Sequence, residues 1–160
     1  MKVPIRTPEQ ILAHRSLKEI VGAWSDVWSV KPSDTVSTAL QLMIDKDIGF
    51  LVVLEADALV GVLSERDCAR RVLAVEKPPN STPVADVMVR NIVTIELAQS
   101  FAESLRLMHT HHVRHLPVVR GGKVIAVVSV RDLMGETVEH HRKVIDELER
   151  ERMTMLTSTA

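Results

Sequence analysis

The chain is poor in cysteine, aromatic residues and net charge. Its single cysteine, Cys68, excludes an internal disulfide and favours a reducing compartment. Its position inside a predicted helix indicates a small buried residue rather than a reactive thiol. Tyrosine is absent and there are only two Phe and two Trp, which argues against a base-stacking surface for single-stranded nucleic acid. The net charge of -1 gives no electrostatic footprint for nucleic acid or an anionic membrane.

Long apolar runs are missing as well. No segment approaches the roughly 20 apolar residues that a membrane-spanning helix needs, and residues 1–10 have no apolar signal core. We therefore expect a soluble cytoplasmic protein with neither nucleic acid nor membrane as a partner. Hydrophobic residues still make up 46% of the 160 residues, which is enough for a sizeable core without disulfides.

The chain does contain an internal repeat, and such a repeat decides the architecture. Residues 61–67 (GVLSERD) are followed 65 positions later by residues 126–132 (AVVSVRD). At this offset, and without a gap, identical residues recur for Leu42, Met43, Leu51, Val53, Val62, Ser64, Arg66 and Asp67.

Hydrophobic spacing predicts the order strand, helix, strand, turn, strand, helix in each copy. Ser33 or Asp34 should cap the first helix, whose apolar face runs from Val36 to Ile44. The continuous apolar runs 48–54 and 59–63 predict strands, the first of them buried on both faces, with a turn between them.

The first copy then closes with a helix over 64–75, whose inward residues should be Ala69, Val72 and Leu73. In the second copy, 116–119 and 124–128 predict strands around a turn at Gly121-Gly122.

The flanking segments look helical. Thr7-Pro8 predicts the start of a helix that Gly22 ends. Ser129 should open a helix running to about Gly135, followed by an exposed helix with one apolar edge from Val138 to Leu148. We divide the chain into an N-terminal extension, a first repeat, a second repeat, and a C-terminal amphipathic helix with its tail, at residues 1–14, 15–79, 80–137 and 138–160.

A tandem β-α-β-β-α repeat ending in a Gly-x-x-Ser-x-x-Asp-type motif resembles the cystathionine-β-synthase (CBS) domain, two copies of which form a CBS pair or Bateman module. Residues 30–36, the pair Ile48-Gly49 and residues 113–118 (VRHLPV) strengthen a match that covers roughly residues 15–137. The chain is similar to stand-alone two-repeat CBS proteins.

This resemblance implies an α/β (α+β) fold in which the repeats pack as a pseudo-twofold pair with helical extensions. It also implies a disc-like homodimer. The apolar helix faces around Val72 and Met134 would suit that contact, and the tail from Val138 to Leu148 could lengthen the dimer or present a partner site.

The resemblance further implies a role in signal transduction, with two clefts that take adenosine-containing regulatory ligands such as AMP, ADP, ATP, NAD(H) or S-adenosylmethionine. The motif Asp would accept the ribose hydroxyls, and the motif Ser would face the phosphate. The implied nucleotide-binding residues are Ile48, Gly49, Phe50, Ser64, Arg66, Asp67, Val113, Arg114, His115, Pro117, Ser129, Arg131 and Asp132.

These residue types suit that chemistry. A carboxylate accepts two O–H donors at once, a helix start offers unpaired N–H groups and the positive end of its dipole to a phosphate, and arginine can bind phosphate through two hydrogen bonds. In the family, each cleft combines the Asp of one repeat with the second strand of the other. Asp67 would then face residues 113–115 (VRH), and Asp132 would face residues 48–50 (IGF). This favours a phosphorylated adenosine at Asp67 and a less charged ligand, or none, at Asp132.

Two other interpretations stay open. Ser-x-x-Asp at a helix start is close to a capping box, which would suit a ligand-independent dimerisation scaffold; however, an Arg precedes the Asp in both copies, and capping does not require it. A metal-responsive protein would use the cluster His109, His111, His112 and His115, although no Cys or acid lies near it in sequence. No Ser/His/Asp order, Cys/His pair or phosphate-binding glycine loop is visible, so we expect no enzymatic activity. The regulated protein target does not follow from the sequence.

Overall fold

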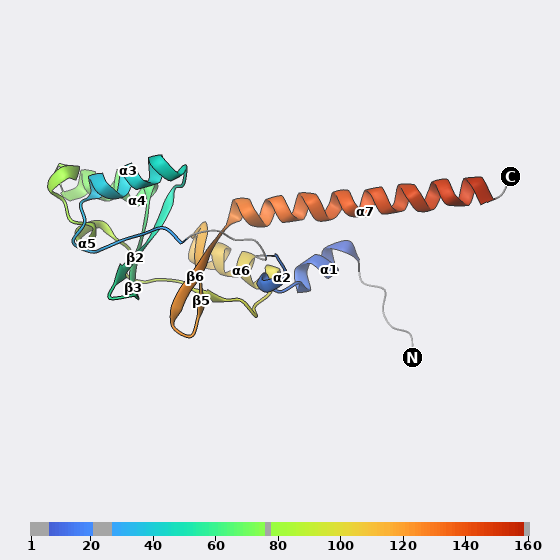
Figure 1. Cartoon of the computed structure of the whole chain (residues 1–160), viewed down its shortest axis with the longest axis horizontal. Coiled ribbons are helices and arrows are strands. Elements are labelled where there is room, and N and C mark those ends of the chain that lie inside the picture. The colour runs from blue at the N-terminus through green and yellow to red at the C-terminus, as the bar shows by residue number, and fades with distance from the viewer. Residues whose placement is uncertain (1–6, 21–26, 76–77, 159–160) are drawn as a thin grey trace. The chain divides into compact units, whose positions relative to one another are not determined.

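The repeated β-α-β-β-α order is present in the computed structural model, which describes residues 7–20, 27–75 and 78–158 (Figure 1). The first repeat consists of β1, α3, β2, β3 and α4, and the second of β4, α6, β5, β6 and α7. The elements are α1 (Pro8–His14), α2 (Leu17–Ile20), β1 (Ser29–Val30), α3 (Val36–Lys46), β2 (Phe50–Glu55), β3 (Ala58–Ser64), α4 (Glu65–Val75), the 3₁₀ helix η1 (Pro79–Ser81), α5 (Val84–Val87), β4 (Ile95–Glu96), α6 (Phe101–His111), β5 (His115–Arg120), β6 (Lys123–Ser129) and α7 (Val130–Ser158).

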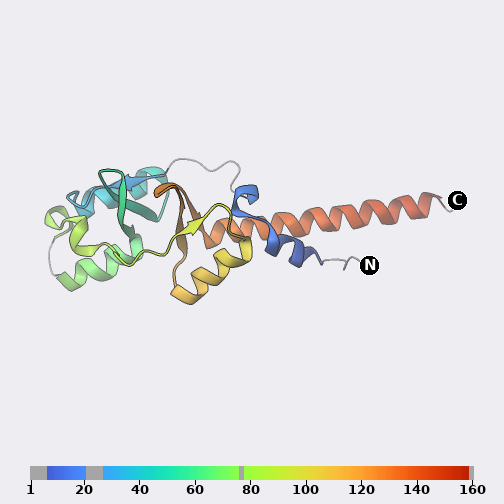
Figure 2. The ribbon, with the colours of Figure 1, turned by 90° about the horizontal axis from the view of Figure 1, so that it is seen from below.

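Each repeat forms a three-stranded sheet, in the orders β1-β2-β3 and β4-β5-β6. The first strand of each sheet is parallel to the second, because a helix connects them, whereas β2 and β3 are antiparallel. The middle strands bury three consecutive residues, 51–53 in β2 and 116–118 in β5. The apolar runs therefore predicted strands buried on both faces correctly. Figure 2 shows the ribbon turned by 90°.

Both predicted hairpin turns are present. The second uses Gly121 and Gly122 at φ angles of 57° and 78°, a conformation that glycine adopts without steric cost. The first reaches the same left-handed region with Ala56 and Asp57, at 46° and 66°. Two consecutive positive φ angles are what a two-residue hairpin with right-handed strand twist requires.

The predicted cap of α3 was wrong. The cap is Thr35, whose hydroxyl accepts from the Thr38 N–H at 3.1 Å. Asp34 instead accepts from the Lys31 N–H at 2.7 Å and closes the preceding turn. Ser33 is exposed and does not cap the helix.

The apolar face of α3 is narrower than predicted. Val36, Ala39 and Met43 are buried in the core of the first repeat, but Ile44 is 70% exposed. Positions 36, 39 and 43 lie on one stripe of the helix. Successive residues are rotated by about 100° around the helix axis, so Ile44 points away from the stripe and towards solvent.

The inward face of α4 also differs from the prediction. Cys68 is buried and Val72, one turn later, is half-buried, whereas Ala69 is exposed. The stripe is therefore centred on positions 68 and 72 rather than 69. The side chain of Leu73 lies outside the described residues.

The N-terminal segment forms two short helices instead of the single helix expected up to Gly22. Arg15 is extended and ends α1, and the Leu17 N–H donates to the Gln99 carbonyl at 2.9 Å. A tertiary hydrogen bond thus replaces a helical one at this point. The predicted end at Gly22 lies outside the described residues.

The C-terminal helix α7 is continuous through Gly135, so the end expected near that residue was wrong. A glycine inside a helix costs about 1 kcal/mol, but tertiary contacts hold the helix on both sides of it. Leu133 is fully buried, and Glu136 forms an ion pair with Arg15. None of the helices in the described ranges combines the length and apolarity that crossing a bilayer requires.

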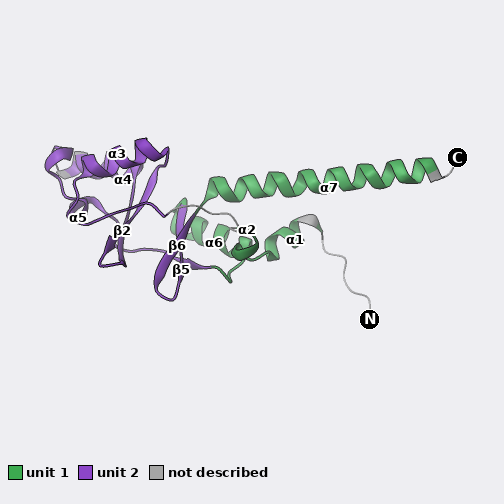
Figure 3. Ribbon diagram, viewed as in Figure 1, with its two compact units in different colours: residues 1–22, 97–114, 128–160 green, residues 23–96, 115–127 purple. Residues whose placement is uncertain are grey.

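Two compact units interleave along the chain (Figure 3). Unit 1 comprises residues 1–22, 97–114 and 128–160, and unit 2 comprises residues 23–96 and 115–127. The start of α4 belongs to unit 2 and the start of α7 to unit 1. The repeat boundaries that we assigned from the sequence are a separate division and stay predictions.

Candidate functional site

The first candidate motif lies where β3 runs into α4. The Asp67 N–H donates to Ser64 Oγ at 3.1 Å. In return, the Ser64 N–H and hydroxyl donate to Asp67 Oδ2 at 3.1 and 2.5 Å. Serine is a favoured cap because its side-chain oxygen satisfies a first-turn N–H, and the acid three residues later completes a reciprocal capping box.

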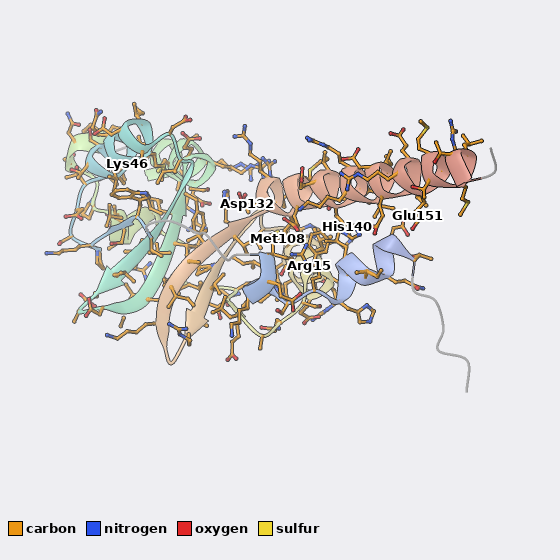
Figure 4. All side chains as sticks on the ribbon, turned by 45° about the vertical axis from the view of Figure 1, so that its right-hand side comes forward. Arg15, Lys46, Met108, Asp132, His140 and Glu151 are labelled. Carbon is orange, nitrogen blue, oxygen red and sulfur yellow. The ribbon has the colours of Figure 1, made fainter. Side chains whose placement is uncertain are left out.

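The second motif, where β6 runs into α7, repeats this arrangement; Asp132 lies at the N-terminal end of α7 (Figure 4). The Asp132 N–H donates to Ser129 Oγ at 3.1 Å, and the Ser129 N–H and hydroxyl donate to Asp132 Oδ2 at 2.8 and 2.6 Å. Both motifs therefore close a helix cap, and both serine hydroxyls are engaged in it.

Each capping carboxylate uses only one of its oxygens. Within the described ranges, Oδ1 of Asp67 and Oδ1 of Asp132 receive no hydrogen bond from the protein. The arginines beside them, Arg66 and Arg131, are exposed, and their backbone N–H groups have no hydrogen bond within these ranges either. Each helix start thus combines an available acceptor oxygen, an available N–H and a guanidinium.

Glu65 was not among the site residues predicted from the sequence. Its N–H donates to the Gly49 carbonyl at 3.1 Å, and a Cβ placed on Gly49 would lie 3.1 Å from Glu65 Oε2. In the second copy, the Val130 N–H donates to the Arg114 carbonyl at 2.9 Å. Each second-strand entry is therefore bonded to the helix start of its own repeat. The signal for Glu65 was its place between the repeated Ser and Arg, where the two copies differ.

Two predicted site residues, Phe50 and His115, meet inside unit 2. Their rings are stacked with centroids 4.6 Å apart and planes inclined by 14°. They begin β2 and β5 and are equivalent in the repeat, so the first residues of the two middle strands contact each other. Both side chains are half-buried.

The remaining predicted residues have the following positions. Ile48 and Val113 are half-buried just before β2 and β5, Arg114 is exposed, and Pro117 is buried in β5. We expected residues 113–115 to face Asp67. These contacts do not test that expectation, so it stays a prediction. The same holds for Asp132 and residues 48–50.

The histidine cluster lies at the end of α6. His109 and His111 are in its last turn, and His112 ends the helix in a left-handed conformation with φ 54°. All three are exposed, and His115 is stacked on Phe50. In the part of the chain that the structure describes, no three His, Cys, Asp or Glu side chains are grouped to hold a metal ion.

Cys68 is 3% exposed, which confirms its prediction as a buried residue. Burial, followed by the nearby charge of Asp67, raises its pKa from 9.0 to about 11. Since only the thiolate is nucleophilic, this thiol is inert at neutral pH.

Comparison with known proteins gives consistent matches. The family model described as CBS domain matches residues 17–74 and 84–139. The CBS domain-containing protein CBSX3, mitochondrial, of Arabidopsis thaliana is 30% identical over 136 residues, which is 82% of this chain and 65% of that protein. The chain therefore spans just under two thirds of this relative.

Solved structures share the fold. A protein with CBS domains from Burkholderia ambifaria MC40-6 is 34% identical, with a TM-score of 0.75 over 78% of this chain and 95% of the other. The CBS domain pair of protein MJ0100, solved in complex with 5′-methylthioadenosine and S-adenosyl-L-methionine, is 20% identical, with a TM-score of 0.69 over 78% of this chain and 97% of the other. At that identity, the second similarity concerns the fold alone.

Proposed function

The chain belongs to the CBS domain family, and on that basis we propose that it is a regulatory module whose Ser-x-Arg-Asp motifs bind an adenosine-containing nucleotide. The observation that carries the proposal is the available Oδ1 of Asp67 and of Asp132, each beside an exposed arginine. Candidate ligands are AMP, ADP, ATP, NAD(H) and S-adenosylmethionine. The ligands solved with the MJ0100 domain pair belong to the same chemical class.

The cap geometry suggests how the roles are divided. Oδ2 of Asp67 stays with the helix cap, while Oδ1, with two lone pairs, accepts the two ribose hydroxyls. The Ser64 hydroxyl already donates to the carboxylate, so it is a poor phosphate donor. The Arg66 guanidinium and N–H at the positive end of the helix dipole take that role instead.

The charges around the two motifs favour different positions for the phosphate. The expected partner strand favours Asp67, because Arg114 and His115 would face it. The charge within the motif favours Asp132, because Val130 replaces Glu65 there and removes one negative charge. We assign ribose binding to both motifs and leave the position of the phosphate to the variants below.

Regulation follows from differential affinity. A ligand that binds one arrangement of the module more tightly shifts the population towards it, by no more than the difference in binding free energy. A partner protein or a second copy that contacts only one arrangement would then respond to the nucleotide.

Calorimetry on the full chain with AMP, ATP, NADH and S-adenosylmethionine tests the proposal. In Asp67→Asn and Asp132→Asn, the amide oxygen can still accept from the capping serine, while an NH₂ replaces the ribose acceptor. We expect saturable binding in the wild type and its loss in at least one variant, with the melting temperature nearly unchanged. Arg66→Gln and Arg131→Gln should weaken AMP binding but not adenosine binding, which identifies the phosphate position.

The second candidate function is a ligand-independent scaffold, which the closed capping boxes favour. It predicts no binding heat with any of these ligands at millimolar concentration. Under that function, both Asp→Ala variants would lower the melting temperature through loss of the cap alone.

A further inference from the structure

The C-terminal part of α7 carries exposed apolar side chains. The helix contacts α6 near its start and α1 as far as His141, and beyond that residue it continues with no described element beside it (Figures 1 and 2). Val138, Ile145, Leu148 and Met155 are 68%, 56%, 59% and 70% exposed. A row of exposed apolar side chains along one helix of a folded protein marks an interaction surface.

The spacing of these residues is that of a coiled coil. From Val138 onward, the residues of this face are separated alternately by three and four positions. The average of about 3.5 residues per turn keeps them facing a partner helix along the whole segment. The core positions are Val138, His141, Ile145, Leu148, Arg152 and Met155. Four are apolar, and the two polar ones determine which partner fits.

A parallel pair of identical helices is unfavourable. In that arrangement each core residue meets its own copy, so Arg152 would face the Arg152 of the second copy in a desolvated layer. A buried pair of like charges is strongly destabilising. His141 would likewise face His141.

In an antiparallel pair of helices, the apolar core residues of the two copies lie opposite one another. With the twofold axis between Ile145 and Leu148, each Ile145 packs against the Leu148 of the second copy. Val138 then packs against Met155 at each end. All four apolar positions thus meet apolar positions.

The same register places Arg152 opposite His141. Arg152 of one copy then lies near a carboxylate of the other copy, because within each copy Glu9 Oε1 lies 3.6 Å from His141 Nε2. On the flank, Arg142 comes opposite Glu149 of the second copy, which is a complementary pair. The antiparallel register therefore replaces the Arg–Arg contact with attractive contacts.

We propose that residues 138–155 of α7 pair with the same segment of a second copy of this chain as antiparallel helices. The pairing does not depend on nucleotide binding. It links two copies of the chain through a segment that lies almost entirely after the second family match, which ends at residue 139.

Sedimentation of the full chain tests whether this face self-associates. Leu148→Asp places a charge on the stripe, and Thr154→Asp places the same charge on the exposed opposite face as a control. Because each dimer buries two copies of Leu148, we expect the dimer dissociation constant to rise on the order of 100-fold in Leu148→Asp and to stay unchanged in Thr154→Asp. Equal circular dichroism melts show that both variants fold.

Disulfide trapping tests the relative orientation of the two helices. The native Cys68 does not interfere, because it is buried. In the antiparallel pair, two copies of residue 138 lie about 26 Å apart along the axis, beyond the roughly 7 Å that a disulfide spans between Cα atoms. We expect Val138→Cys mixed with Met155→Cys to form a covalent dimer under mild oxidation, and neither variant to do so alone. Cross-linking of either variant alone, or no cross-linking in the mixture, overturns the proposal. A wild-type chain that sediments as a monomer at high concentration also overturns the proposal. The exposed apolar residues of α7 would then serve to bind a helix of another protein.

Discussion

Replacing Gly61 with alanine should destabilise the first repeat. A Cβ on Gly61 would lie 2.5 Å from Met88 Sδ, 3.0 Å from its Cγ and 3.3 Å from its Cβ. Rotating the end of that side chain moves Sδ and Cγ away, but the 3.3 Å contact with the Met88 Cβ remains, so the neighbouring backbone must shift by a few tenths of an ångström. Met88 is 5% exposed, and the adjacent backbone is held by reciprocal hydrogen bonds of 3.0 and 2.8 Å between Val62 and Val89.

The expected magnitude combines two opposing effects. Overpacking a core costs about 1–3 kcal/mol, and the lower entropy of the unfolded chain with alanine returns about 0.4–1 kcal/mol. With about 2 and about 0.7 kcal/mol as the middle values of these ranges, we expect Gly61→Ala to lower the free energy of unfolding by about 1 kcal/mol. Ala126, 2% exposed, is the equivalent residue in the second repeat. The reverse change, Ala126→Gly, should cost about 1 kcal/mol through lost burial and added flexibility.

Urea unfolding of the single variants and of Gly61→Ala/Met88→Ala checks this reasoning. Met88→Ala alone should cost about 2–5 kcal/mol, and because it removes the atoms that clash, the double variant should lose at least about 0.5 kcal/mol less than the sum. If Gly61→Ala is neutral or stabilising, or if the two effects are additive, contact with Met88 is not what requires glycine at this position.

Three further predictions concern the core and the caps. Burial raises the pKa of Cys68 from 9.0 to about 11, so the unfolded chain loses this proton first; the contribution of Cys68 to the free energy of unfolding should be constant below pH 9 and fall as the pH rises towards 11, so the difference between the wild type and Cys68→Ala in urea titrations should change only above pH 9. Thr35→Ala should cost about 1 kcal/mol as a lost cap, whereas Ser33→Ala should leave the melting temperature unchanged; equal effects would contradict the assignment of the cap. Met43→Ala should cost about 2–5 kcal/mol and Ile44→Ala less than about 0.5 kcal/mol in the same assay, and a large effect at Ile44 would show that its side chain is buried.

The repeat and its strands were predictable because their signals are local. Buried strands such as residues 51–53 are continuous apolar runs, and the turns at Gly121-Gly122 and at Ala56-Asp57 interrupt them. The two repeats agree position by position: β2 and β5 share one order of buried and exposed residues, and so do β3 and β6. Short apolar runs bounded by turn residues, with helical spacing between them, were sufficient for this part of the fold.

The errors arose where tertiary contacts compete with local preference. Asp34 is a good cap in isolation, but its carboxylate closes the turn at Lys31, which leaves the cap to Thr35. The helix expected up to Gly22 ends at Arg15, because the next residues bond to the segment before α6. Gly135 does not end α7, since contacts on either side hold the helix.

The candidate site was predictable in composition but not in bonding. Its serines and acids were identified from their repetition, including the possibility that they form caps. Which carboxylate oxygen the cap uses depends on side-chain rotamers that no spacing encodes. The position of Glu65 against Gly49 likewise depends on the geometry of strand and helix.

The continuity of α7 has a mechanical consequence. Its 29 residues span about 44 Å, and the helix begins at the cap formed by Ser129 and Asp132. A tilt of about 5° at that end moves the other end by about 4 Å, given the rise per residue. This displacement is perpendicular to the helix axis and is nearly half of the roughly 8–10 Å that separates packed helices, so a small rotation at the motif would be enough to move the tip of α7 out of contact with a partner helix.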